Sequence, residues 1–172
     1  MTIFDVLTTQ HREVEELFGD VQNAINTGQL ELARVAFQLL SNKLIAGMHA
    51  EHTMVYPQFA KHAGLTDEVV EAIKEHDAIE GAINHVRVGT ANDDQWCDGV
   101  ARLGKLVADH ADFEECNLFP IARLSLTTEQ ERSIAADYQR AKSASAPLAG
   151  VSITYAPEPP APVYCYVRPR AA

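Results

Sequence analysis

The sequence predicts an all-α protein built as an antiparallel up-down four-helix bundle, with a short extra C-terminal helix and an irregular tail. Apolar residues recur with the helical period over four long stretches of the chain. Short polar connections separate these stretches, and no segment shows the clear alternation of a half-buried strand. Long helices joined by short connections pack antiparallel to their neighbours, so a bundle follows.

The first predicted helix covers about residues 2–26. An apolar residue stands at nearly every third or fourth position, and the stretch ends in the sequence NTG at 26–28, which is a helix stop signal. The second helix covers about residues 29–61 and keeps this spacing as far as Val55. Each helix is long enough to form one side of a bundle.

The third helix opens at the sequence LTD, residues 65–67, and closes before Gly89. The fourth follows the sequence NDD at 92–94, whose side chains can cap its first turn, and its core-facing stripe continues to Leu118. A shorter helix follows Thr128 and ends at about Lys142.

Size and composition favour one helical domain, residues 1–142, and a Pro/Ala-rich tail, residues 143–172. A chain of 172 residues that is 47% hydrophobic can bury a core of ordinary size. Most of the eight prolines lie after residue 142, in segments such as APEPPAP without helical periodicity. This composition is typical of a flexible segment.

The charge balance argues against two classes of partner. The chain has 14 basic and 24 acidic residues, a net charge of −10, and no run of lysine or arginine. We therefore expect neither nucleic acid nor an anionic membrane as its main partner. Three widely spaced cysteines do not form a disulfide framework, and no apolar stretch is long enough to span a bilayer. A reduced, cytoplasmic location fits these features best.

The sequence contains an internal repeat. The segment QHREVEELF at 10–18 resembles EHDAIEGAI at 75–83, which aligns His11 with His76. The segment AEHTMVYP at 50–57 resembles FEECNLFP at 113–120, which aligns Glu51 with Glu114. The chain is thus two copies of a helical pair, each with a histidine on its first helix and a glutamate before an aromatic-proline pair on its second.

Ionisable residues interrupt the apolar stripes of all four long helices. They are His11, Glu51, His76, His110 and Glu114. A buried ionisable side chain is costly unless something binds it. Packing alone does not explain three imidazoles and two carboxylates in one interior, whereas a bound metal does. This ligand type suits iron or manganese, and thiolate ligands are missing.

These residues, in this order, resemble the hemerythrin family, the HHE cation-binding domain, over roughly residues 2–142. The family motif has a histidine on the first and third helices, His-x3-Glu on the second and fourth, and an aromatic-proline pair after each glutamate. The resemblance implies a non-haem di-iron centre with two oxo- or hydroxo-bridged iron ions. It further implies that Glu51 and Glu114 bridge the irons and that each histidine binds one of them.

One position departs from the family pattern. The histidine expected four residues before Glu51 is Gly47. His49 lies about 200° from Glu51 around a helix, so it should face away from the core, whereas His52 lies at the margin, about 100° away. His52 can bind metal if the helix is locally widened. We expect the missing side chain at Gly47 to make room for an exogenous ligand or for His52.

Three functional classes are consistent with the sequence. The first is a di-iron protein that binds or reacts with O2, peroxide or NO; its sparse ligand set favours peroxide or NO chemistry over oxygen carriage and leaves a peroxide-decomposing activity open. The second is iron storage, iron delivery or cluster repair. None of the seven histidines follows a glutamate by three residues, which disfavours a ferritin-like site. The third class is a metal-free helical adaptor.

Overall fold

The computed structural model describes residues 1–88 and 92–145, and in this part of the chain it contains helices and no strand. The elements are α1 (Ile3–Asn26), α2 (Leu30–Ala50), η1 (Glu51–Val55), α3 (Tyr56–Ala63), α4 (Thr66–Val88), α5 (Asp93–Phe113), η2 (Glu114–Leu118), α6 (Phe119–Ser125) and α7 (Thr128–Ser145). The prediction of an all-α fold is confirmed. None of the described helices is both long enough and apolar enough to cross a membrane.

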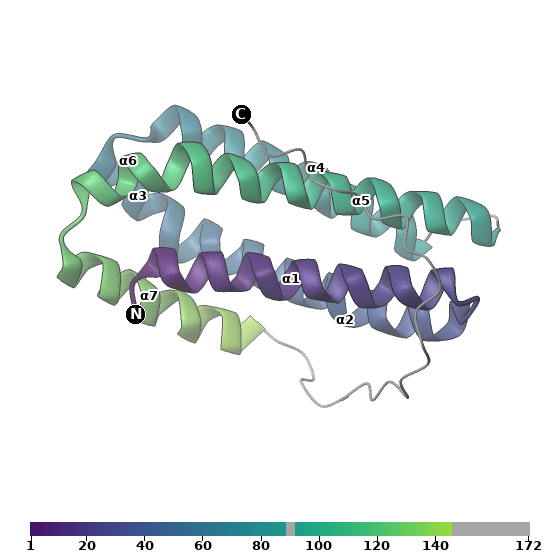
Figure 1. The fold of residues 1–172 in the computed structure, drawn as a ribbon. Coiled ribbons are helices and arrows are strands. Elements are labelled where there is room, and N and C mark those ends of the chain that lie inside the picture. The colour runs from purple at the N-terminus through teal and green to yellow at the C-terminus, as the bar shows by residue number, and fades with distance from the viewer. Residues whose placement is uncertain (89–91, 146–172) are drawn as a thin grey trace, which may run out of the picture.

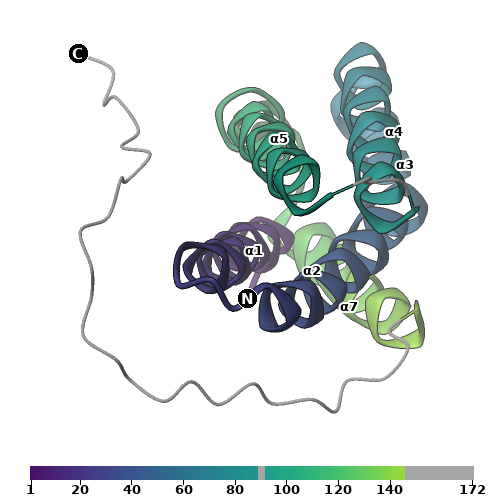
Figure 2. The ribbon, with the colours of Figure 1, turned by 90° about the vertical axis from the view of Figure 1, so that its right-hand side faces the viewer.

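Four of these helices run side by side along the length of the molecule. Figure 1 shows α1 beside α2 and α4 beside α5, and Figure 2 shows the same four helices close to end-on. The fifth helical segment, α7, packs against α2 and α1. It is the extra C-terminal helix that the sequence predicts.

The helix ends follow the predicted local signals. α1 begins with a capping box between Thr2 and Asp5, and it ends before Gly28, whose φ of 72° is readily adopted only by glycine. Asn92 caps α5 by accepting a hydrogen bond of 2.9 Å from the Gln95 N–H. α7 continues to Ser145, slightly past the predicted end, and the predicted tail from residue 146 onward lies outside the described residues.

Two short π-turns interrupt helices that the sequence predicts to be continuous. In η1 the Tyr56 N–H donates to the carbonyl of Glu51, and in η2 the Phe119 N–H donates in the same way to Glu114. The next residue in each case is a proline, which has no N–H and whose ring clashes with the carbonyl one helical turn earlier. A regular turn cannot continue past that proline, and the widened turn accommodates it. The internal repeat therefore includes the backbone geometry.

Two apolar clusters divide the core. One contains Phe4, Phe59 and Tyr138, and the other contains Phe37 and Trp96. We call α1, α2 to α3, α4, and α5 to α6 the four long helical segments, and each contributes to both clusters. Buried polar side chains lie on each segment at or next to the point where one cluster gives way to the other. The packing thus places the ionisable groups of all four segments at one level of the molecule, with apolar side chains on both sides.

Candidate metal centre

The five predicted ligands lie on the four long helical segments at this middle level. His11 lies on α1, His76 on α4 and His110 on α5, while Glu51 and Glu114 are the first residues of η1 and η2. Glu51, His76, His110 and Glu114 are buried, and the His11 side chain is 14% exposed. The structure brings all five into one polar cluster.

The three imidazoles all direct Nε2 toward the carboxylates. His76 Nε2 lies 3.3 Å from Glu51 Oε2 and 2.8 Å from His110 Nε2. Ligand atoms of Glu51, His76 and His110 all lie within 4.8 Å of one another, a group that can hold a metal ion. His11 Nε2 lies on the other side of the cluster, 3.2 Å from Glu114 Oε2.

The opposite ring nitrogen of each histidine has a partner of its own. His11 Nδ1 pairs with Glu115 Oε1 at 2.9 Å, and His110 Nδ1 pairs with Glu75 Oε2 at 2.8 Å. His76 Nδ1 lies 2.8 Å from His52 Nε2. A partner at Nδ1 fixes the ring orientation and leaves Nε2 for a metal, which is the usual arrangement around metal-bound histidine.

Several ligand atoms of the centre lack a partner that a cation would supply. Glu114 Oε2 is buried and accepts no hydrogen bond from the described residues, although His11 Nε2 lies 3.2 Å away. An orphaned buried carboxylate oxygen carries an energetic cost that an ion removes. Two facing Nε2 atoms at 2.8 Å also need a proton or a metal between them. The residues present therefore fit a metal with nitrogen and oxygen ligands.

Burial disfavours the charged form of every group in the centre, and neighbouring groups decide which keep a charge. Burial and the facing Glu114 raise the pKa of Glu51 to about 7, and burial and the neighbouring His110 lower the pKa of His76 to about 2. Burial also opposes a charge on His11, but Glu114 outweighs it and raises the pKa of His11 to about 9. Glu114 is buried too, yet His11 and His110 lower its pKa to about 2. Burial also opposes a charge on His110, but Glu75 and Glu114 outweigh it and raise the pKa of His110. Without a metal, these shifts favour a charged pair of Glu114 and His11.

Tyr56 adds a hydroxyl group to the centre. The sequence predicts this residue only as the aromatic member of an aromatic-proline pair. Its hydroxyl donates to Glu114 Oε1 at 2.8 Å and lies 3.3 Å from His76 Nε2. The π-turn of η1 precedes Tyr56, and the side chain is 1% exposed. The phenol therefore lies among the ligand atoms rather than in the surrounding core.

The space beside Gly47 is not open, which corrects the expectation for this position. Gly47 is buried, but a Cβ atom there would lie 2.2 Å from Gln10 Nε2. Gln10 thus fills the place of the missing histidine. His52 is half-buried and contacts the outer nitrogen of His76, while His49 is exposed, as its offset predicts.

Sequence reasoning missed the groups that support the ligands. Glu75 and Glu115 are not among the predicted site residues, yet each pairs with the outer nitrogen of a histidine. The internal repeat offered a signal for Glu115, because the alignment of Glu51 with Glu114 also matches Glu115 to His52, which pairs with His76 in the same way. The repeat also matches Gln10 to Glu75 and Gly47 to His110, but it does not show that Gln10 fills the space beside Gly47.

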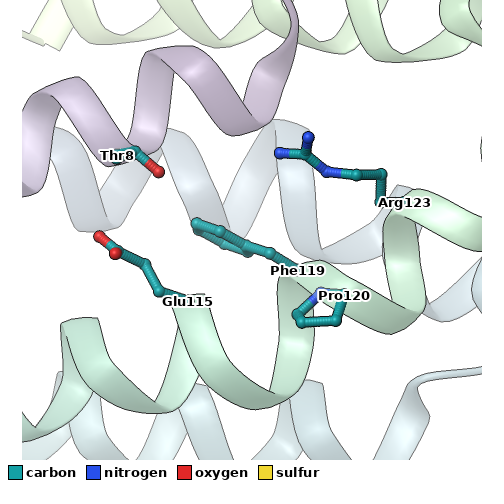
Figure 3. A pocket seen from close by; sticks show the side chains of 5 residues that line it. All are labelled: Thr8, Glu115, Phe119, Pro120 and Arg123. Atoms are coloured by element: carbon teal, nitrogen blue, oxygen red, sulfur yellow. The ribbon is translucent and has the colours of Figure 1, made fainter.

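Figure 3 shows a surface pocket of about 310 Å³. Its lining residues are Thr8, Glu115, Phe119, Pro120 and Arg123. Glu115 is the partner of His11 Nδ1, and the Phe119 ring stacks on the His11 ring with 6.1 Å between centroids. Two of the residues that line the pocket thus contact His11, the one predicted ligand that is partly exposed.

A family model for the hemerythrin HHE cation-binding domain matches residues 2–122. This chain belongs to that family. The match includes all five predicted ligands, so the hemerythrin-like resemblance inferred from the sequence is confirmed. α7 lies beyond the matched residues.

A curated relative is described as a DNA nickase from Nostoc sp. and is 27% identical to this chain over 143 residues. The alignment covers 83% of this chain but only 40% of the relative, so the chain spans less than half of that protein's length. No solved structure matches the chain significantly.

The contact at Gly47 predicts an unusual result for Gly47→Ala. Alanine is favoured over glycine in a helix by about 1 kcal/mol, but here its methyl group must displace Gln10. We expect the free energy of unfolding to fall by about 1–2 kcal/mol, because Gln10 loses its buried hydrogen bonds. Gly19→Ala is the matched control, since no described atom outside its own stretch of helix lies within 4 Å of its Cβ position, and it should stabilise the protein. Urea denaturation measures both, and equal stabilisation would contradict the assignment.

The charged pair predicts a pH dependence for the metal-free protein. His11 has a folded pKa of about 9 against an ordinary value of 6.5, so the folded chain retains a proton that the unfolded chain has released. This contribution is fully present below pH 6.5 and is lost as the pH rises through 9. The raised pKa of Glu51 also lowers stability as the pH rises, but it does so mainly between pH 4.5 and pH 7, below this window. We expect the free energy of unfolding to fall by about 1–2 kcal/mol between pH 7 and pH 9.

Urea denaturation of chelator-treated protein tests this slope. Glu114→Gln removes the anion that holds the proton on His11, so the slope should become shallower in that variant. A free energy of unfolding that stays constant from pH 7 to pH 9 in the unsubstituted protein would show that His11 is neutral in the folded chain.

Proposed function

We propose that this chain is a di-iron protein that binds or reacts with a small oxidant or gas, namely O2, peroxide or NO, inside an antiparallel up-down four-helix bundle. The supporting observation is the orientation of the three histidines. Each turns Nε2 toward two buried carboxylates while a separate partner holds Nδ1, and one carboxylate oxygen accepts no hydrogen bond from the described part of the chain.

The ligands divide into two proposed metal positions. Position 1 is formed by Glu51, His76 and His110, whose ligand atoms already lie together. Position 2 is formed by His11 and Glu114. The carboxylates of Glu51 and Glu114 would be shared between the positions. Bound iron would supply redox electrons and a coordination position for an exogenous ligand.

The protein's own residues would control what reaches the irons. Apolar clusters on both sides of the centre exclude water, which strengthens electrostatic interactions inside it. The Tyr56 hydroxyl donates to Glu114, so it holds a proton next to the ligand atoms. The surface pocket, two of whose lining residues contact His11, would offer a small molecule a place to bind near position 2.

The curated relative suggests DNA nicking as a second candidate function. A net charge of −10 opposes binding to a polyanion, because nucleic-acid affinity depends largely on cationic contacts with phosphates. We therefore do not propose nucleic acid as a partner. Incubation of the iron-loaded protein with supercoiled plasmid tests this choice, and we expect no nicked product above that of a Glu51→Ala/Glu114→Ala variant.

Metal analysis and optical spectra test the main proposal. Protein expressed with ample iron should contain about two irons per chain, and azide, peroxide or NO should change its near-ultraviolet and visible absorption. Glu51→Ala and Glu114→Ala should lose most of the metal, because each removes a buried carboxylate ligand. His49→Ala, at an exposed histidine, is the control and should retain it. One zinc per chain, or no metal at all, would contradict the proposal.

A further inference from the structure

The internal repeat matches His52 to Glu115, and these two residues contact the outer nitrogens of two matched histidines. Glu115 Oε1 lies 2.9 Å from Nδ1 of His11, and His52 Nε2 lies 2.8 Å from Nδ1 of His76. Each of these outer partners directly follows a predicted glutamate ligand in the sequence. The two contacts therefore correspond in sequence and in geometry, but one partner is a carboxylate and the other is an imidazole.

The fold holds His52 against His76. His52 is the second residue of η1, and its side chain is half-buried. Its ring is inclined by 22° to the His76 ring, with 4.8 Å between the centroids, and it also lies beside the Tyr56 ring at a centroid distance of 5.7 Å. These contacts restrict rotation of the His52 side chain, so that its Nε2 stays next to Nδ1 of His76.

The position of one proton decides whether His76 can bind a metal. A neutral imidazole carries a single ring proton, so Nε2 of His76 is free for a metal only when that proton is on Nδ1. The Nδ1–H group then needs an acceptor, because His76 is only 2% exposed and a buried donor without a partner is costly. His52 Nε2 provides this acceptor at 2.8 Å. His52 thus favours the tautomer and the ring orientation that metal binding requires.

The chemical type of the acceptor also affects the metal ligand. A carboxylate at the outer nitrogen makes a metal-bound histidine more basic and adds a negative charge, and both effects stabilise Fe(III) relative to Fe(II). His11 and His110 have carboxylate partners, namely Glu115 and Glu75. His52 is neutral when it accepts a hydrogen bond, because a protonated imidazole has no free ring nitrogen.

We infer that His52 is a positioning residue for His76: it holds Nε2 toward position 1 and, as a neutral acceptor, keeps the bound iron more easily reduced than a carboxylate would. The inference rests on the proposed function, and it gives His52 a role other than direct metal ligation. A higher reduction potential favours Fe(II), the oxidation state that can donate electrons to O2 or peroxide.

Anaerobic calorimetric titration of the metal-free protein with Fe(II) tests the positioning role. His52→Ala should lower the affinity for Fe(II) by about 10–100-fold, because the Nδ1–H group of His76 loses its acceptor. His52→Gln should restore most of this affinity, since its carbonyl oxygen can accept the same hydrogen bond and its length equals that of the matched Glu115. His49→Ala, at an exposed histidine three residues earlier, is the control and should bind Fe(II) as the unsubstituted protein does. Unchanged affinity in His52→Ala would overturn the inference.

Redox titration of the iron-loaded protein tests the effect of the neutral acceptor. His52→Glu and His52→Gln have side chains of the same length and differ in charge. We expect the reduction potential of His52→Glu to lie below the potentials of His52→Gln and of the unsubstituted protein. His49→Glu adds a negative charge at an exposed position of the same segment, so it controls for charge alone and should shift the potential less.

The outcomes separate this inference from the proposed function. Equal potentials in His52→Glu and His52→Gln would overturn the inference and leave the di-iron proposal intact. An unsubstituted protein that binds no Fe(II) would overturn both. Should His52→Ala not fold, the comparison of His52→Glu with His52→Gln still decides the inference.

Discussion

The structure depends on the burial of two carboxylates and three imidazoles between two apolar clusters. Such groups are unstable in a dry interior unless each polar atom has a partner, and their partners come from helices far apart in the sequence. Glu51 contacts groups on α1, α4 and α7, and Glu114 contacts groups on α1, α3 and α5. The polar centre therefore restricts how the helices can be rotated about their axes, whereas the apolar clusters tolerate other arrangements.

The sequence predicts the helices well because their signals are local. Apolar spacing, the cap at Asn92 and the glycine at 28 act within a few residues, and the structure places helix ends at both points. The five inward-facing ionisable residues were also predictable, since each interrupts an apolar stripe. Their meeting in one cluster could be inferred from the repeat together with helix packing.

The rest of the centre could not be predicted, because it depends on contacts between distant segments. Gly47 reads as a missing ligand, and only the structure shows that Gln10 of α1 takes its place. Gln10 in turn is held by Tyr138 and Lys142, which lie at the opposite end of the described chain. A local widening of the second helix was considered only as a condition for metal binding by His52, and the structure has a π-turn there. The second π-turn was missed, although the proline after each aromatic residue is a local signal that a regular helix ends there.

The two π-turns limit where residues can be inserted into or deleted from this chain. A turn closed by a π-type hydrogen bond contains one residue more than the α-turn it replaces, so it acts like a single inserted residue within a helix. Removing one residue from η1 would restore the α-turn and rotate α3 by about 100° relative to α2. Tyr56 and Phe59 would then leave the interior together. Insertions and deletions should therefore be tolerated in the connections between helices, while the spacing from each glutamate to its aromatic residue is held constant.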